Sequence, residues 1–322
     1  MKCIISGYGV SLDTSIAYFG DRSVPFWTDG IESPSFIACG DGYLFALTEN
    51  SYYAAIYAYR REGMSYRLTD RRSVAGRALC HLAYSSVNKL LVGSCYGSGH
   101  VLCAQFDPET GKFGDVDAIE QLGEIQSRAH CAVFNSAEDR VYTANLGLDK
   151  LFIYRVEGGK LVEDAVVSTP EGSGPRHLRL SVDEKLLYVV TEYSNEILVY
   201  DVADWSLRQQ VSTLPANHFG TSHCSTLCVS KDGRFVYAAN RYADNIAVLE
   251  IGQDGLLTLK ANFDCGGRSP RHMELTESGN HLVICCQDSD WVVIKHINTE
   301  TGMPTHTTRE IPFNAPGCVA FL

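Results

Sequence analysis

The sequence lacks the long apolar runs that membrane helices require. No segment approaches the ~18 consecutive apolar residues of a transmembrane helix, and the opening residues 1–8 turn polar too soon for a secretory signal peptide. Basic residues are also few, 27 against 38 acidic ones, so the net charge at pH 7 is −11. This charge argues against nucleic acid or an anionic membrane as a partner. We therefore expect a cytoplasmic protein with no membrane and no nucleic-acid partner, and its oligomeric state stays open.

Several catalytic and metal-binding signatures are missing as well. The chain has no G-x-S-x-G nucleophile elbow, no P-loop, no H-E-x-x-H motif and no dinucleotide fingerprint before a helix. It has 12 cysteines but no C-x-x-C pair, and most stand singly inside apolar segments. This pattern is typical of buried free thiols in a reducing compartment, not of a structural zinc site. The sequence predicts no cofactor and no metal.

What the sequence does contain is a phrase that recurs along its whole length. A short strand-like run leads through a polar turn into two further runs rich in Val, Ile, Tyr and Leu. One copy reads Arg176–Ser181, then Leu187–Val190, then Ile197–Tyr200. The residues taken to open the first run of each copy lie between 45 and 49 positions apart; they are Phe36, His81, His130, His177, Thr226, His272 and Cys318.

Seven copies at this period predict an all-β fold, a seven-bladed β-propeller with four-stranded blades. Turn residues such as Asp232-Gly233 separate the runs, and no stretch of about 11 residues has helical periodicity. The last copy, at 316–322, has only its first strand, and the segments 2–8 and 16–19 can supply its missing partners. Pairing the N- and C-terminal strands in one blade removes an open sheet edge. We expect a single domain over residues 1–322.

Matching residues of successive blades converge on one mouth of the propeller channel, because the first strand of each blade lines that channel. The strand openings supply His81, His130, Arg176, His177, Arg271 and His272, and the turns after second strands add Asn145, Glu192 and Arg241. Arg176 and Arg271 both follow a proline, and two arginines aimed at one mouth predict an anion clamp. Glu192 is expected to be an ionised carboxylate that orients or deprotonates water.

Each of these residues has a structural alternative. A histidine that recurs at one register position can simply satisfy backbone groups at the start of a strand, and this applies to His81, His177 and His272. His130 differs, because Arg128-Ala129 precedes it where Pro-Arg precedes His177 and His272, and we predict a functional role for it. For Glu192 and Arg241 the alternative is a solvated loop position.

The phrase running from Gly174-Pro175-Arg176-His177 to Thr191-Glu192 resembles the lactonase family of seven-bladed propellers. That family includes bacterial propeller-type 6-phosphogluconolactonases and fungal carboxy-cis,cis-muconate lactonizing enzymes. The likeness covers nearly the whole chain, including 129–134, 145–149, 232–241, 269–272 and 318–321. It implies that His130, Arg176, Glu192 and Arg241 are catalytic. The other mouth positions are predicted to bind substrate, namely His81, Asn145, His177, Arg271 and His272.

The leading hypothesis is hydrolysis of a sugar lactone, in first place 6-phosphogluconolactone to 6-phosphogluconate. The arginines would hold the phosphate and polarise the lactone carbonyl, while His130 and Glu192 manage water and proton transfer. The second hypothesis is cycloisomerisation of a carboxylated muconate, with the arginines on its carboxylates. In both cases the partner is a small anionic substrate, a phosphosugar lactone or a carboxylated lactone. The third is a propeller that binds a ligand or protein without turnover.

Overall fold

The protein is described by a computed structural model that covers residues 2–8, 15–20, 23–25, 31–63 and 65–322. Within these residues the regular elements are β-strands, apart from one short 3-10 helix at Gln287–Ser289. The described strands form seven four-stranded sheets, and their neighbouring strands pair antiparallel, as β1 does with β2, β13 with β14 and β17 with β18. The all-β class and the four strands per repeat are therefore confirmed in the described part of the chain.

The chain divides into two compact units, and the first consists of Met1–Ser168 with Gly317–Leu322. It holds four of the sheets. Their strands are β1 (Cys3–Gly7), β2 (Ile16–Phe19), β3 (Ser23–Pro25) with β28 (Pro316–Phe321); β4 (Ile37–Gly40), β5 (Tyr43–Glu49), β6 (Ala54–Glu62), β7 (Ser65–Val74); β8 (Leu79–Ser85), β9 (Leu90–Cys95), β10 (His100–Asp107), β11 (Lys112–Glu120); and β12 (Ala129–Phe134), β13 (Arg140–Asn145), β14 (Lys150–Glu157), β15 (Lys160–Ser168).

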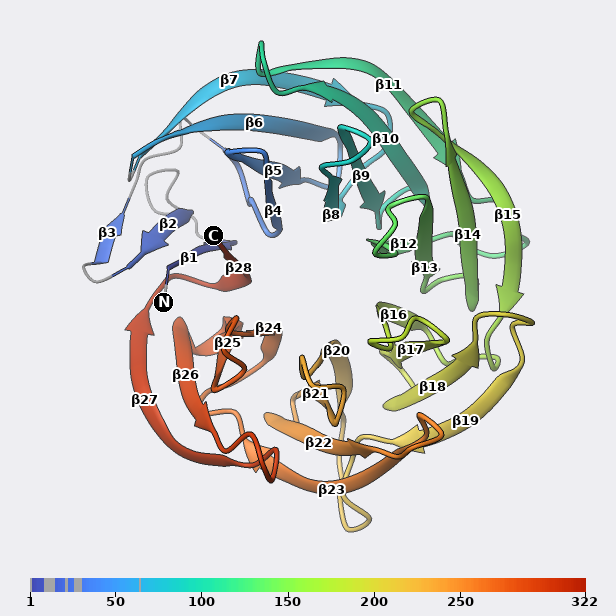
Figure 1. The fold of residues 1–322 in the computed structure, drawn as a ribbon, viewed down its shortest axis with the longest axis vertical. Helices are drawn as coiled ribbons and strands as arrows, with labels where there is room; N and C mark the ends of the chain where they lie inside the picture. The colour runs from blue at the N-terminus through green and yellow to red at the C-terminus, as the bar shows by residue number, and fades with distance from the viewer. Residues whose placement is uncertain (1, 9–14, 21–22, 26–30, 64) are drawn as a thin grey trace. The chain divides into compact units, whose positions relative to one another are not determined.

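The second unit, Thr169–Pro316, holds three sheets. Their strands are β16 (Pro175–Leu180), β17 (Leu186–Thr191), β18 (Glu196–Asp201), β19 (Leu207–Ser212); β20 (His223–Val229), β21 (Phe235–Arg241), β22 (Asn245–Ile251), β23 (Leu257–Asp264); and β24 (Pro270–Leu275), β25 (His281–Cys286), β26 (Trp291–Ile297), β27 (Pro304–Pro312). Within this unit the first strands β16, β20 and β24 neighbour one another, and the fourth strands lie on the opposite side of the sheets (Figure 1). Matching residues of first strands are thereby brought close together.

The ends of the chain meet in the first unit, as the sequence predicts. That sheet has the order β28-β1-β2-β3, so the last strand pairs with the first. The backbone N–H of Leu322 also donates to the carbonyl of Lys2 at 3.3 Å. Cys318 packs there in a buried cluster with Ile4 and Ile16. An otherwise open sheet edge is closed by this pairing. The single-domain prediction stays a prediction.

Burial decreases from the second strand of a sheet to its fourth, and the sequence explains why. Every residue of β17 and β21 is buried, and both strands are apolar runs up to their last residues, Thr191 in β17 and Asn240-Arg241 in β21. In β19, Leu-Arg-Gln-Gln-Val-Ser, no residue is fully buried. Strands buried on both faces read as near-continuous apolar runs, and solvent-facing strands read as polar or alternating. The runs that predicted strands in the sequence are therefore the inner ones.

The turns between first and second strands repeat one design in the second unit. After β20, the hydroxyl of Ser230 donates to Asp232 Oδ1 at 2.6 Å, and Gly233 has a φ of +68°. After β16, Ser181 donates to Asp183 Oδ1 at 2.7 Å in the same way. A residue without a side chain adopts the left-handed conformation at little cost, which accounts for Asp232-Gly233 at the predicted hairpin tip.

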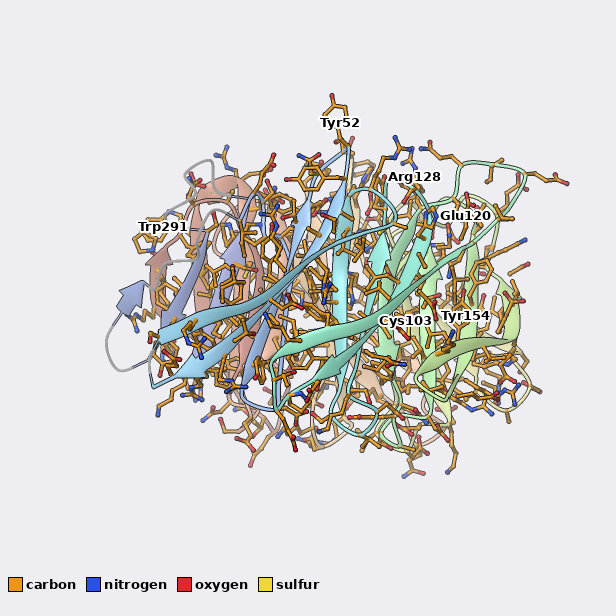
Figure 2. The ribbon with its side chains drawn as sticks, turned by 90° about the horizontal axis from the view of Figure 1, so that it is seen from above. Tyr52, Cys103, Glu120, Arg128, Tyr154 and Trp291 are labelled. Carbon is orange, nitrogen blue, oxygen red and sulfur yellow. The ribbon has the colours of Figure 1, made fainter. Side chains whose placement is uncertain are left out.

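The cysteines are free thiols, all 12 of them, and all but Cys39 are buried. Burial raises the pKa of Cys103 and of Cys224 to about 12, so both stay protonated and unreactive at neutral pH. Figure 2 shows Cys103 and Tyr154 among the strands of the first unit, whereas Tyr52, 87% exposed, points away from the ribbon. The predicted buried thiols are confirmed. Among the described residues, no helix is long and apolar enough to cross a membrane.

Candidate functional site

The first strands that carry predicted site residues share a β-bulge at their second residue. The pairing register shifts between Leu79 and His81, Ala129 and Cys131, Pro175 and His177, and Pro270 and His272. The residues inside these bulges are Cys80, His130, Arg176 and Arg271. A bulge bends its strand and re-aims the side chain it carries, and bulges are common beside active sites.

This register corrects one part of the repeat comparison. His130 matches Arg176 and Arg271, whereas His81, His177 and His272 stand one position further along their strands. The recurring histidine is therefore not at one position in all four repeats. The spacing between successive repeats varies from 45 to 49 residues, so an offset of one residue between two repeats is hidden in the sequence. The strand-pairing partners reveal it. No arginine precedes His130 because His130 itself takes the arginine's place.

An ion-pair cluster forms where β16, β17 and β21 meet in the second unit. Arg176 Nε donates to Glu192 Oε2 at 2.9 Å, and Arg241 Nη2 lies 2.9 Å from the same oxygen. Glu192 follows the last residue of β17, and Arg241 is the last residue of β21. We call Arg176, Glu192, Arg241 and Arg271 the arginine–glutamate cluster. All four were predicted as site residues. The structure brings Arg176, Glu192 and Arg241 into direct contact, and the charge of Arg271 acts on Glu192 by lowering its pKa.

The cluster is buried and carries an excess of positive charge. The side chains of Arg176, Arg241 and Glu192 are only 3%, 9% and 13% exposed. Burial alone raises the pKa of Glu192, but the charges of Arg176, Arg241, Arg271 and His223 outweigh it, and the pKa lies below its usual range. Glu192 is therefore ionised at neutral pH. Three guanidinium groups against one carboxylate leave two positive charges in excess.

Backbone carbonyls hold the arginines in place. Arg176 Nη1 donates to the carbonyl of Ser225 on β20, and Arg241 Nη2 lies 3.4 Å from the carbonyl of Cys224. Arg241 Nε is buried and has no hydrogen-bond partner among the described residues. A buried donor without a hydrogen bond costs about 1–3 kcal/mol of folding free energy. Such donors are rare in folded proteins, and a functional role is one explanation for them. The cluster therefore contains one buried N–H donor, Arg241 Nε, that makes no hydrogen bond within the described part of the chain.

His223 is a residue of this site that the sequence did not reveal. It opens β20, pairs with Arg241 across the sheet, and places Nδ1 at 3.8 Å from Glu192 Oε1. Its ring meets the rings of Tyr193 and Tyr242 edge to face, at centroid distances of 5.7 and 5.6 Å. Its place opposite Arg241 could have identified it, but this place is known only when the pairing register of β20 and β21 is known.

Two further predicted residues of the second unit lie deeper on the same strands. His177 Nδ1 is 3.1 Å from the hydroxyl of Thr226, and its ring centroid is 6.3 Å from that of His272. Burial, with the charges of Arg179 and Arg176, lowers the pKa of His272 to about 3. His272 is therefore neutral at physiological pH. Both histidines are buried beside the cluster, and their predicted substrate contacts stay predictions.

The remaining predicted residues, His81, His130 and Asn145, belong to the first unit. Asn145 accepts from the backbone N–H groups of Arg128 and Leu148 and donates to Gln121 and Ser127, at 2.8 to 3.1 Å. These contacts favour a structural role for it.

Two histidines of this unit differ in surroundings. His81 lies against Phe36, with ring centroids 4.1 Å apart, and its Nδ1 is 3.4 Å from the backbone nitrogen of Ala132. His130 is buried, and its ring meets that of Tyr96 edge to face at 5.9 Å. The packing of His81 suits a structural histidine, whereas His130 stands inside the bulge of its strand.

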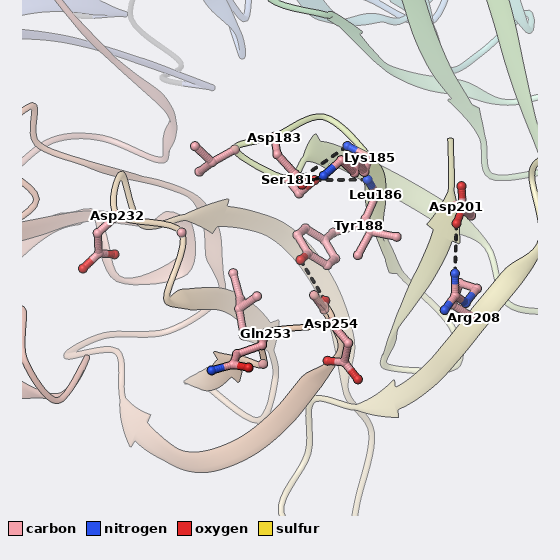
Figure 3. Close-up of a pocket in the computed structure, with 15 residues that line it drawn as sticks. Ser181, Asp183, Lys185, Leu186, Tyr188, Asp201, Arg208, Asp232, Gln253 and Asp254 are labelled. Carbon is pink, nitrogen blue, oxygen red and sulfur yellow. Dashed lines mark hydrogen bonds and ion pairs between the residues drawn. The ribbon is translucent and has the colours of Figure 1, made fainter. Parts of the chain in front are cut away.

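A separate hollow of about 430 Å³ opens in the second unit at the turns that follow β16 and β20 (Figure 3). Its lining includes four aspartates, Asp183, Asp201, Asp232 and Asp254, against the two cations Lys185 and Arg208. Arg208 pairs with Asp201 at 2.9 Å, and Lys185 pairs with Asp183 at 3.0 Å. An acidic lining does not suit an anionic ligand. The arginine–glutamate cluster lies at the other end of these strands.

Known proteins match the chain over nearly its whole length. The family model described as "Lactonase, 7-bladed beta-propeller" matches residues 22–321. The 6-phosphogluconolactonase of Bacillus subtilis (strain 168) is 27% identical over 330 residues, which cover 98% of this chain and 94% of that protein. A solved structure from Lactobacillus plantarum matches with a TM-score of 0.91 at 21% identity, over 100% of both chains. The Pseudomonas aeruginosa periplasmic gluconolactonase PpgL gives 0.90 at 21% identity, over 100% of this chain and 98% of that one. These matches confirm the predicted seven-bladed β-propeller.

Proposed function

The chain belongs to the lactonase family of seven-bladed β-propellers, and on that premise we propose that it hydrolyses a sugar lactone, 6-phosphogluconolactone in first place. The B. subtilis relative named 6-phosphogluconolactonase supports this substrate. The resemblance implies four catalytic residues, which are His130, Arg176, Glu192 and Arg241.

One observation carries the proposal: a chain of net charge −11 gathers three arginines around a single carboxylate. Arginine is the usual partner of phosphate and carboxylate groups, because its planar fork of donors matches their oxygens. Two positive charges in excess, in a site that is largely shielded from water, attract an anionic substrate strongly. A 6-phosphogluconolactone brings both a phosphate and a polarisable carbonyl.

The chemistry requires water to add to the lactone carbonyl carbon and the ring C–O bond to break. Negative charge develops on the carbonyl oxygen during the addition, and a guanidinium of the cluster stabilises it. Fixed donors of this kind contribute about 10²–10³ to the rate each. Glu192 keeps two guanidinium groups in position and offers its second oxygen to a water molecule. Because the arginines lower the pKa of Glu192, its carboxylate is a weak base and is better suited to orienting water than to removing its proton.

The proposal is tested by a coupled assay of the purified protein with freshly made 6-phosphogluconolactone, corrected for spontaneous opening. Gluconolactone without the phosphate and a carboxylated muconate serve as comparison substrates. We expect the phosphorylated lactone to react fastest, because only it can engage the excess guanidinium charge while its carbonyl is attacked. Absorbance loss with the muconate alone would point to cycloisomerisation, and binding without turnover of any of the three would point to a non-catalytic propeller.

A further inference from the structure

We infer that His223 is the general base of this site. Its Nε2 accepts a proton from the attacking water, while the carboxylate of Glu192 faces its Nδ1. This inference rests on the proposed lactone hydrolysis and names a group that neither the repeat pattern nor the resemblance singled out.

The geometry of His223 is that of an imidazole backed by a carboxylate. Its Nδ1 faces Glu192 Oε1 at 3.8 Å, the oxygen that the arginines leave open, since both arginine contacts fall on Oε2. Catalytic hydrogen bonds are often long in a protein without ligand and tighten around the substrate. A carboxylate on the Nδ1 side fixes the tautomer that presents Nε2 as the proton acceptor. The side chain is 34% exposed, so water reaches it.

Two tyrosines frame the imidazole, and the backbone is adapted to place them. Tyr242 has a φ of +69°, a left-handed conformation that is unfavourable for an aromatic residue, and its side chain stays 57% exposed. Tyr193 lies over Gly174, where an added Cβ would come within 2.6 Å of the Tyr193 ring. The rings of Tyr193 and Tyr242 both meet the His223 ring edge to face.

The proposed step balances without any added reactant. The water oxygen forms a bond to the lactone carbonyl carbon, its proton passes to Nε2 of His223, and the carbonyl π electrons move onto the carbonyl oxygen. When the carbonyl re-forms, the bond from that carbon to the ring oxygen breaks. The proton on Nε2 passes to the ring oxygen, which becomes the hydroxyl of the open acid. The acid then releases its proton to solvent, and His223 is neutral again.

The test compares His223→Gln and His223→Ala with the native protein on 6-phosphogluconolactone, over about pH 5 to 9. His223→Gln keeps the size of the side chain but cannot exchange protons, and we expect kcat to fall about 10²-fold or more with little change in KM. The acid limb of the pH–rate profile should disappear. The ionisable groups beside His223 are Glu192, Arg241, Tyr193 and Tyr242, so Tyr242→Phe must keep this limb. Added imidazole should restore part of the activity of His223→Ala, because the side chain of His223 is 34% exposed.

His306→Gln, on the exposed strand β27, is the matched control and should leave kcat unchanged. The inference is overturned if His223→Gln keeps its activity and its acid limb while Glu192→Gln and Arg176→Ala are inactive, an outcome that leaves the lactonase proposal standing. It is also overturned if imidazole does not restore a correctly folded His223→Ala protein, since lost packing rather than lost proton transfer then explains the defect. A native protein inactive on every lactone overturns both proposals.

Discussion

Glu192 and Arg241 occupy the same register position in two successive sheets, and their side chains meet at 2.9 Å. One repeat contributes the carboxylate and the next contributes its counter-charge. The preceding bulge supplies the second guanidinium, Arg176, to the same carboxylate oxygen. A site thus arises where neighbouring repeats share a backbone position but differ in the charge placed on it.

Replacement of Glu192 by Gln should reduce both activity and stability. The change leaves two buried guanidinium groups without their carboxylate, and breaking a buried pair costs about 3–5 kcal/mol. We expect kcat/KM to fall by about 10² or more, with a clear loss in the free energy of unfolding measured in urea. Glu277→Gln is the control, because its side chain is 95% exposed and its ion pair with Lys231 spans 3.9 Å. Equal unfolding curves for the native protein and Glu192→Gln would show that the cluster contributes nothing to stability.

The sequence predicted the architecture in some detail, because apolar runs and turn residues are local signals. The inner strands, the Asp232-Gly233 turn and the pairing of the two chain ends could all be read from it. The fourth strands were harder to see, since β19 is polar and follows no apolar run.

The site was predicted only in part, for a reason that lies in strand pairing. Arg176, Glu192, Arg241 and Arg271 stand out as charges within apolar phrases. The bulges shift the register by one, so His130 was aligned with His81 and not with Arg176. His223 is the first residue of β20, and only its pairing with Arg241 and its distance to Glu192 mark it.

Arg176→Lys should be nearly as damaging as Arg176→Ala. Arg176 reaches Glu192 through Nε and the carbonyl of Ser225 through Nη1, and a single ammonium cannot span both partners in the same geometry. We expect KM for the phosphorylated lactone to rise and kcat to fall in steady-state assays. Arg208→Lys, on a side chain that is 48% exposed, should behave like the native protein. Full activity in Arg176→Lys would mean that charge alone, without the guanidinium fork, is sufficient.

His130 and His81 should respond differently to replacement by Gln. His81 is packed against Phe36 and the backbone of β12, so its replacement is expected to lower the melting temperature more than kcat. His130 stands in the bulge that carries arginine in other repeats, so its replacement should lower kcat more than the melting temperature. Thermal unfolding and initial rates on the same two preparations separate the roles. If His81→Gln lowers kcat more than the melting temperature and His130→Gln does the opposite, the catalytic and structural roles of the two histidines are exchanged.

Acid should destabilise the protein through His272. Its pKa is about 3 in the folded state, below the ordinary value near 6.5, so the unfolded chain binds the proton more readily between these limits. The free energy of unfolding therefore falls as the pH drops from about 6.5 towards 3, by up to ~1.4 kcal/mol per pH unit from this group. Glu192 adds a loss in the same direction once the pH falls through its lowered pKa. Urea unfolding at several pH values should show a shallower slope for His272→Gln, and an unchanged slope would refute this assignment.

The proposed lactonase site is tested most directly by the rate of 6-phosphogluconolactone opening with native protein, Glu192→Gln and Glu277→Gln, each corrected for spontaneous hydrolysis. We expect strong acceleration by the native protein and by Glu277→Gln, and its loss in Glu192→Gln. Equal rates for native protein and Glu192→Gln would contradict it.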